Sequence, residues 1–205
     1  MKSRLRKLGR VVIALILICA VAIAIALFSM AGEDKKHEKF YSTGKSVNSF
    51  LSAYNHALKH ASLDNDPSTL LSFYSDSYVS PGRGRWVMQR EQDAGGAACY
   101  RFVADGNGDF TRDDLRAELA GYLGGLSAIE DNKLKIDMIE HVDLERSVVL
   151  TVKFILDGRD LRGALFQDRH FYRWYLVNED SSARTYDWKI VRDELVEGVR
   201  VAGDG

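Results

Sequence analysis

The sequence predicts an α+β fold that follows a single membrane-spanning helix. An uninterrupted apolar stretch over residues 11–31 predicts the membrane-spanning helix. Between residues 47 and 126, apolar side chains recur at three- and four-residue steps, which is typical of amphipathic helices. From residue 135 onward they alternate at every second position, which is typical of β-strands. Helices followed by a run of strands indicate helices packed on an antiparallel sheet.

The start of the chain predicts a membrane anchor. Basic residues fill the flank at residues 1–10, and no charged residue occurs over residues 11–31. At about 1.5 Å per residue, a helix of that length crosses the roughly 30 Å hydrocarbon core of a bilayer. A cleaved secretory signal is the alternative, because Ser29 and Ala31 would allow cleavage before Gly32. The apolar stretch is longer than a signal peptide needs, so we favour a retained signal anchor.

The basic residues also predict the orientation of the anchor. Five lysines and arginines precede the apolar stretch, whereas three lysines follow it within residues 35–39. Because Lys and Arg favour the cytoplasmic side, we expect a cytoplasmic N-terminus and a periplasmic or otherwise extracytoplasmic domain. Residues 32–45 would form a linker between the two. Membrane lipid around the anchor and membrane proteins are the expected partners.

Composition and motifs exclude several function classes. The net charge is −1 and the pI is about 6.5, which argues against nucleic acid as a partner. The sequence has no Gly-x-Gly-x-x-Gly helix opening, no P-loop and no Cys/His cluster, so we expect no cofactor and no metal. The chain is long enough for one globular domain, which we place at residues 46–198. Residues 199–205 would form a flexible C-terminus.

Two helices are predicted at the start of this domain. Apolar residues over 47–61 form one stripe of the first helix, and His56 and His60 lie at or beyond the edge of that stripe. Asp66 is a suitable N-cap for the second helix. Pro67 suits the first position of that helix, because its missing N–H would be unpaired there in any protein.

A third helix and six strands complete the prediction. Two short strands, Trp86–Arg90 and Ala98–Val103, precede the helix. The helix begins near Thr111, whose hydroxyl can cap it while Asp114 stands three residues later. Four long strands rich in β-branched and aromatic residues follow the helix, over Lys135–Val142, Ser147–Leu156, Leu161–Val177 and Tyr186–Leu195.

The order of these elements and the end of the last strand resemble a known superfamily. The two helices meet at an Asn-Asp-Pro turn, the second ends in the segment Phe73–Tyr78, and the last strand carries Trp188, Ile190 and Asp193 as Trp-x-Ile-x-x-Asp. On these features, residues 47–196 resemble the NTF2-like (SnoaL-like) superfamily. The resemblance implies three helices on a curved antiparallel sheet, with a cone-shaped cavity between them. Isomerases, dehydratases, ligand binders, homodimerising modules and membrane-complex subunits all use this fold.

Asp168 and His170 are the candidate catalytic residues. Alternate residues of a strand share a face, so we expect both side chains to point into the cavity together with Phe166 and Trp174. A carboxylate that orients an imidazole forms a general acid/base pair. Two other interpretations stay open, namely a hydrogen-bonded structural pair and a strand face that meets a partner subunit.

Aromatic side chains supply the candidate ligand pocket. Aromatic rings stack on flat apolar ligands, although rings at helical or strand spacing also build ordinary cores. The candidates are Tyr54, Tyr74, Trp86, Tyr172 and Trp174.

Two loops carry residues suited to metal or anion binding. The segment Asp105–Asp109 begins like a calcium loop, but Phe110 and Arg116 stand where that loop needs Gly and Glu, so we expect an ordinary turn. Arg83 and Arg85 have the chemistry to hold a phosphate or carboxylate. A solvated loop is the alternative there, because no phosphate-binding motif accompanies them.

Two hypotheses about function follow from the sequence. The leading one is a membrane-tethered, non-catalytic accessory or assembly domain that faces the cell envelope, because tethering raises the effective concentration for membrane partners. The rival is a SnoaL-like small-molecule binder, or an isomerase- or dehydratase-type enzyme, that uses the cavity and the pair Asp168 and His170. An open cavity with the pair inside would favour the rival, and a cavity filled by side chains would favour the first.

Overall fold

A computed structural model describes residues 36–91, 97–180 and 186–203 of the chain. The chain divides into two compact units, Met1–Gly44 and Lys45–Gly205. The predicted basic flank at 1–10 and the predicted anchor at 11–31 lie outside the described residues. Within the described ranges, no helix is both long enough and apolar enough to cross a membrane. Residues 36–45, which we expected to form a linker, are helical. They include three Lys residues and one Glu, which are good helix formers.

Three helical segments belong to the second unit. Residues 45–64 form the first, which we call helix 45–64, and its apolar stripe is buried as predicted. Helix α2, Ser68–Leu71, begins one residue later than predicted, because Pro67 and not Asp66 is its N-cap, and it ends before the segment Phe73–Tyr78. Pro67 has helical backbone angles, with φ −73° and ψ −8°, and Asp66 Oδ1 accepts a hydrogen bond from the Ser68 backbone N–H at 2.9 Å.

Helix α3, Arg112–Gly124, has the predicted N-terminal cap. The Thr111 hydroxyl accepts from the Asp114 backbone N–H, and the Asp114 carboxylate accepts from the Thr111 backbone N–H at 3.0 Å. This capping box satisfies two backbone donors that a helix start otherwise leaves unpaired. Gly125 follows as the C-cap.

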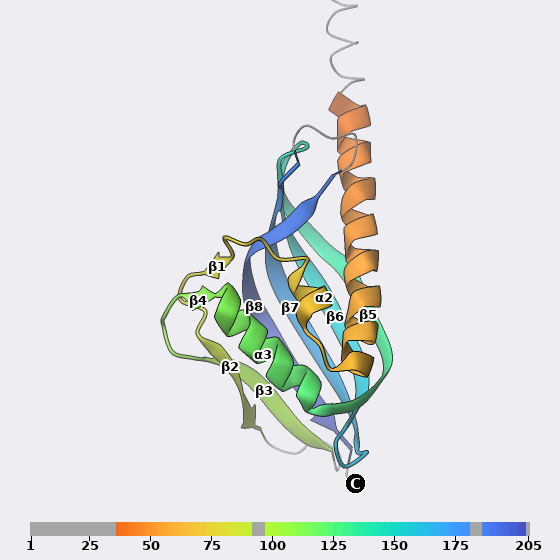
Figure 1. The fold of residues 1–205 in the computed structure, drawn as a ribbon, viewed down its shortest axis with the longest axis vertical. Helices are drawn as coiled ribbons and strands as arrows, with labels where there is room; N and C mark the ends of the chain where they lie inside the picture. The colour runs from red at the N-terminus through yellow and green to blue at the C-terminus, as the bar shows by residue number, and fades with distance from the viewer. Residues whose placement is uncertain (1–35, 92–96, 181–185, 204–205) are drawn as a thin grey trace, which may run out of the picture. The chain divides into compact units, whose positions relative to one another are not determined.

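A six-stranded antiparallel sheet forms the other layer, in the order β2-β3-β8-β7-β6-β5. Figure 1 shows helix 45–64, α2 and α3 over one face of this curved sheet, as the α+β prediction requires. A separate two-stranded sheet pairs β1, Val79–Ser80, with β4, Phe110–Thr111. The strands of the large sheet are β2 Arg85–Arg90, β3 Ala98–Asp105, β5 Leu126–Asp143, β6 Ser147–Asp160, β7 Leu165–Asn178 and β8 Trp188–Ala202.

Two long strands, β5 and β8, extend furthest beyond the ranges that the sequence pattern indicates. Strand β5 begins at Leu126 instead of Lys135, and four register shifts against β6 break its alternation of apolar and polar residues. Strand β8 continues to Ala202, so most of the predicted flexible C-terminus at 199–205 is ordered strand. Its last residues pair on both sides, with Arg200 opposite Tyr100 of β3 and Asp168 of β7. A central position in the sheet explains this order.

Strand β7 confirms the predicted phase of its side chains. Asp168 and His170 are buried on the face that carries Trp174, whereas Arg169 is exposed. A register shift between Phe171 and Tyr172 leaves this phase intact. The strand therefore places both candidate catalytic residues on the helix-covered side of the sheet.

Candidate functional site

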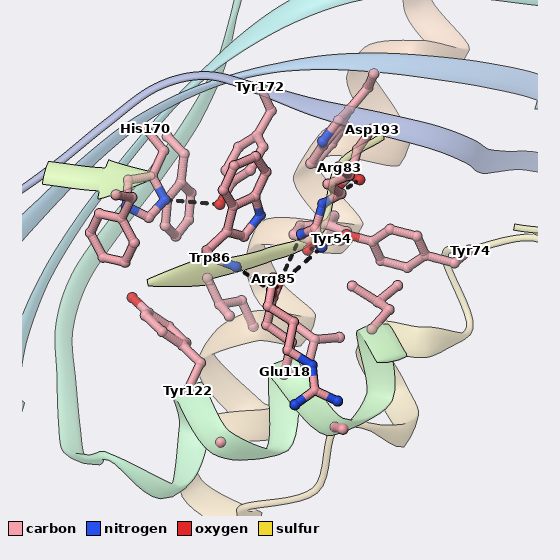
Figure 2. A pocket seen from close by; sticks show the side chains of 18 of the residues that line it. Tyr54, Tyr74, Arg83, Arg85, Trp86, Glu118, Tyr122, His170, Tyr172 and Asp193 are labelled. Atoms are coloured by element: carbon pink, nitrogen blue, oxygen red, sulfur yellow. Dashed lines mark hydrogen bonds and ion pairs between the residues drawn. The ribbon is translucent and has the colours of Figure 1, made fainter. Parts of the chain in front are cut away.

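A cavity of about 410 Å³ lies between the helices and the covered face of the sheet (Figure 2). Helix 45–64, α3, β2 and β7 all contribute side chains to its wall. All five aromatic candidates from the sequence line it, namely Tyr54, Tyr74, Trp86, Tyr172 and Trp174. The remaining wall is mostly apolar, with Leu58, Leu115, Leu119, Leu134, Phe102 and Phe154. The cavity is therefore open, and the candidate aromatic residues surround it instead of filling it.

Asp168 and His170, the candidate acid/base pair, form no hydrogen bond with each other. His170 lines the cavity, but Asp168 does not and is fully buried. Asp168 instead accepts a hydrogen bond from the Tyr122 hydroxyl at 2.7 Å and two from Arg200, each at 2.7 Å. These donors come from α3 and from the end of β8, which are distant in sequence, so the nearby imidazole is not the group that satisfies the carboxylate. We call Asp168, Arg200 and Tyr122 the closed cluster.

His170 lies beside the closed cluster and faces different partners. Its Nδ1 is 2.9 Å from the Tyr172 hydroxyl, and its Nε2 has no hydrogen-bond partner among the described residues. Burial lowers the pKa of His170 to about 4, with the Arg200 charge adding to this effect and the Asp168 charge opposing it. The imidazole is therefore neutral at pH 7.

A second group of buried charges lies in the cavity wall, as Figure 2 shows. Arg83 lies between two carboxylates, with Nη2 2.6 Å from Glu118 Oε1 and Nε 3.1 Å from Asp193 Oδ1. The Trp86 backbone N–H also donates to Glu118 Oε2 at 3.2 Å. We call Arg83, Glu118 and Asp193 the cavity cluster.

No sequence pattern predicts the cavity cluster. We expected Arg83 either to hold an anion or to lie in a solvated loop, but its side chain is buried against two carboxylates of the protein itself. Its guanidinium also lies 3.9 Å from the centre of the Phe110 ring. Arg85, by contrast, has a side chain that is 69 % exposed. No local pattern links Arg83 to Glu118 and Asp193, because the three come from separate parts of the chain.

The cavity cluster contains two carboxylates for one guanidinium, and this affects the pKa of Glu118. Burial raises the pKa of Glu118, and the opposing effect of Arg83 is too small to cancel the rise. Burial by itself would lower the pKa of Arg83, but the charges of Asp193 and Glu118 outweigh it, so the pKa of Arg83 is raised. Glu118 therefore takes up a proton more readily than an exposed glutamate does.

Tyrosine hydroxyls provide further polar groups. The Tyr54 and Tyr74 hydroxyl oxygens are 3.2 Å apart, and the Tyr78 hydroxyl donates to Asp193. Burial is the main reason that the pKa of Tyr54 is raised to about 12, so this residue is a neutral phenol at physiological pH. The site thus combines aromatic walls with a few neutral donors and acceptors.

Comparisons with known proteins identify the fold and do not identify a family. No protein-family model matches the chain, and no curated protein does. A putative scytalone dehydratase from Novosphingobium aromaticivorans has a similar structure, with 14% identity, a TM-score of 0.51 and coverage of 78% of this chain and 87% of that one. A conserved protein from Planctomyces limnophilus has 12% identity and a TM-score of 0.51, over 77% of this chain and 98% of that one.

A third similar structure is a type 2 hexachlorocyclohexane dehydrochlorinase. It has 10% identity and a TM-score of 0.50, over 78% of this chain and 88% of that one. The structural similarity establishes the shared architecture. At identities this low, no residue role can be transferred from these proteins. Together with helices that cover one face of a six-stranded antiparallel sheet, these structures show that residues of the second unit adopt the NTF2-like fold.

Proposed function

We propose that this domain binds a small, flat and largely apolar molecule in the cavity. The single observation that carries the proposal is an open space of about 410 Å³ walled by Tyr54, Trp86, Tyr172 and Trp174. Cavities of this size, with an apolar wall and a few convergent polar groups, are the usual form of ligand sites. The dehydrochlorinase of similar fold is named for a small apolar compound, which supports the proposal by analogy of fold.

The cavity favours a binder over a purely structural accessory domain. A domain that acts through protein contacts gains nothing from unfilled space, and unfilled apolar space lowers stability. Asp168 and His170 form no hydrogen bond with each other, so the geometry gives less support to the enzymatic form of the rival hypothesis. Binding is therefore the part of that hypothesis that the geometry supports.

A membrane tether remains part of the proposal. Its basis is the apolar stretch at residues 11–31 with basic residues before it. In this arrangement the N-terminus is cytoplasmic and the binding domain faces the cell envelope, near lipid and membrane-protein partners. Protease added to spheroplasts should digest the domain, and full protection would contradict this orientation.

A cavity-filling substitution tests the binding proposal. Gly121 lines the cavity from α3, and a Cβ added there would meet no atom within 4 Å. Gly121→Phe should therefore fold normally and occupy space next to the ligand. Ala120→Phe is the matched control, because Ala120 is an exposed neighbour on the same helix and does not line the cavity.

The probe is 1-fluoronaphthalene, followed by ¹⁹F NMR with the full chain in detergent. The wild type and Ala120→Phe should show a protein-bound resonance separate from that of micelle-dissolved probe. Gly121→Phe should lose this resonance. No bound resonance in the wild type, or an undiminished one in Gly121→Phe, would overturn the proposal.

A further inference from the structure

Two histidines lie together on the outer side of helix 45–64. His56 and His60 are both exposed, and their Nε2 atoms are 3.2 Å apart. The ring centroids are 4.3 Å apart with an interplanar angle of 42°. Residues four apart occupy the same face of a helix one turn apart, which is why these rings meet. Neither histidine lines the cavity, so the proposed ligand site does not use them.

The spacing of the two nitrogens matches a metal chelate. Two imidazole nitrogens each about 2.0–2.1 Å from one ion lie about 2.9–3.4 Å apart, for angles between octahedral and tetrahedral. The 3.2 Å separation of the Nε2 atoms falls within this range. An ion could therefore replace the hydrogen bond between the rings without a change in the helix backbone. Each ring would then carry its proton on Nδ1, so no proton has to leave the pair.

The helix holds the pair in place. Tyr54, Leu58 and Ala61 of the same segment are buried, so this part of the helix is fixed to the hydrophobic core. The backbone thus presents the two histidines one helical turn apart on a fixed face before any ion arrives. A preformed pair binds more tightly than two independent histidines, because less conformational entropy is lost.

We propose that His56 and His60 chelate one divalent transition-metal ion, such as Zn²⁺, Ni²⁺ or Cu²⁺. Imidazole nitrogen suits these ions, whereas Mg²⁺ and Ca²⁺ prefer oxygen ligands. Among the described residues, no group of three or more His, Cys, Asp or Glu is arranged to hold a metal ion, so water completes the coordination. The bound ion links two successive turns of the helix that carries Tyr54 and Leu58 into the cavity wall.

Thermal unfolding with added NiCl₂ tests the proposal on the full chain, purified in detergent without a histidine tag. An ion that binds only the folded state raises its folding constant roughly elevenfold at ten times the dissociation constant. For a domain of this size, Tm should rise by about 3–5 °C at that concentration and should continue to rise with the logarithm of the nickel concentration. MgCl₂ should cause no such rise. His56→Gln and His60→Gln should each abolish the nickel effect, since one histidine cannot chelate.

His141→Gln is the matched control, because His141 is an exposed histidine on β5 without a histidine neighbour four residues away. It should keep the full nickel effect. Electron paramagnetic resonance of the Cu²⁺ complex provides a direct readout, with two coupled nitrogens in the wild type and fewer in each single variant. An unchanged nickel effect in His56→Gln or His60→Gln, a lost effect in His141→Gln, or no response to nickel in the wild type would overturn the proposal.

Discussion

The two buried charge clusters of this domain use the same chemistry in opposite ways. In the closed cluster, Asp168 has one guanidinium and one phenol as partners, and its carboxylate does not reach the cavity. In the cavity cluster, one guanidinium serves two carboxylates, and all three side chains line the cavity. The first cluster is balanced, whereas the second has one carboxylate in excess.

Helix α3 connects the two clusters. Glu118 belongs to the cavity cluster and Tyr122 to the closed cluster, and these residues lie one turn apart on the same face of the helix. A buried polar group by itself is therefore weak evidence for function, since Asp168 in the closed cluster is fully hydrogen-bonded within the protein. Charged side chains that line the cavity and an excess of one carboxylate are the features that distinguish the cavity cluster.

The largest predicted effect comes from breaking the closed cluster. Arg200→Met should lower the free energy of unfolding by about 3–5 kcal/mol, because it leaves the fully buried Asp168 without its charge partner. Urea unfolding measures the change. The double substitution Asp168→Asn with Arg200→Met should recover part of the loss, since it removes the unpaired charge as well.

Arg159→Met is the control for this prediction. Arg159 pairs with Glu130 at 2.6 Å, but both side chains are substantially exposed, at 43 % and 49 %. Solvent already screens such a pair, so its loss should leave unfolding almost unchanged. An equal loss of stability in the Arg159 and Arg200 variants would contradict the contrast between buried and exposed pairs.

Local patterns in the sequence predicted parts of the fold around the clusters, but not the partners within either cluster. The capping box at Thr111 depends on residues three apart, and the phase of β7 depends on alternation within one strand, so both were readable from the sequence. The partners of Asp168 could not be predicted in this way. Arg200 lies beyond Leu195, in a segment that is too short to show the periodicity of an independent strand. Only pairing with β3 and β7 orders it.

The cavity cluster was unpredictable for a related reason. Arg83 follows β1 and lies between Gly82 and Gly84, which have φ values of +67° and +60°. Such a sequence is typical of an exposed loop. The burial of Arg83 results from carboxylates that arrive from α3 and β8, and single-sequence patterns do not report contacts between distant segments.

His170 lies beside the closed cluster, and its substitution should give the second largest effect. Its pKa is about 4 in the folded chain against an ordinary value of 6.5, so the unfolded chain takes up a proton first as the pH falls. The neutral imidazole thus contributes stability that is complete above pH 6.5 and is lost as the pH falls toward 4. This difference corresponds to about 3 kcal/mol.

The variant His170→Gln should remove that pH dependence. Urea unfolding of the wild type between pH 7 and pH 4 should show the extra loss, and His170→Gln should show a flatter profile even if its stability at pH 7 is lower. His141→Gln serves as the control, because His141 is exposed, and it should follow the wild type. Parallel profiles for the wild type and His170→Gln would mean that the imidazole is not buried in its neutral form.

Glu118 should make a smaller contribution to the pH dependence of stability, with a sign opposite to that of His170. This contribution is the most direct test of the charge imbalance in the cavity cluster. The pKa of Glu118 is raised above the ordinary value of 4.5, so the folded chain holds this proton more tightly than the unfolded chain. The resulting stabilisation is complete below pH 4.5 and is lost as the pH rises through the raised pKa. We expect an effect below that of His170, because the hydrogen bonds from Arg83 and Trp86 still favour the ionised carboxylate.

The variant Glu118→Gln tests this sign directly. The amide side chain introduced there is not ionisable, and its carbonyl oxygen can still accept from Arg83, so the cluster keeps one guanidinium and one carboxylate. Stability of the wild type relative to Glu118→Gln should therefore fall as the pH rises from about 4.5 to 7, whereas relative to His170→Gln it should rise over the same range. Glu130→Gln is the control, because Glu130 forms only the exposed pair with Arg159, and it should show neither trend. A wild type that gains stability over Glu118→Gln with rising pH would mean that Arg83 fully compensates both carboxylates, and the cavity cluster would then be as balanced as the closed one.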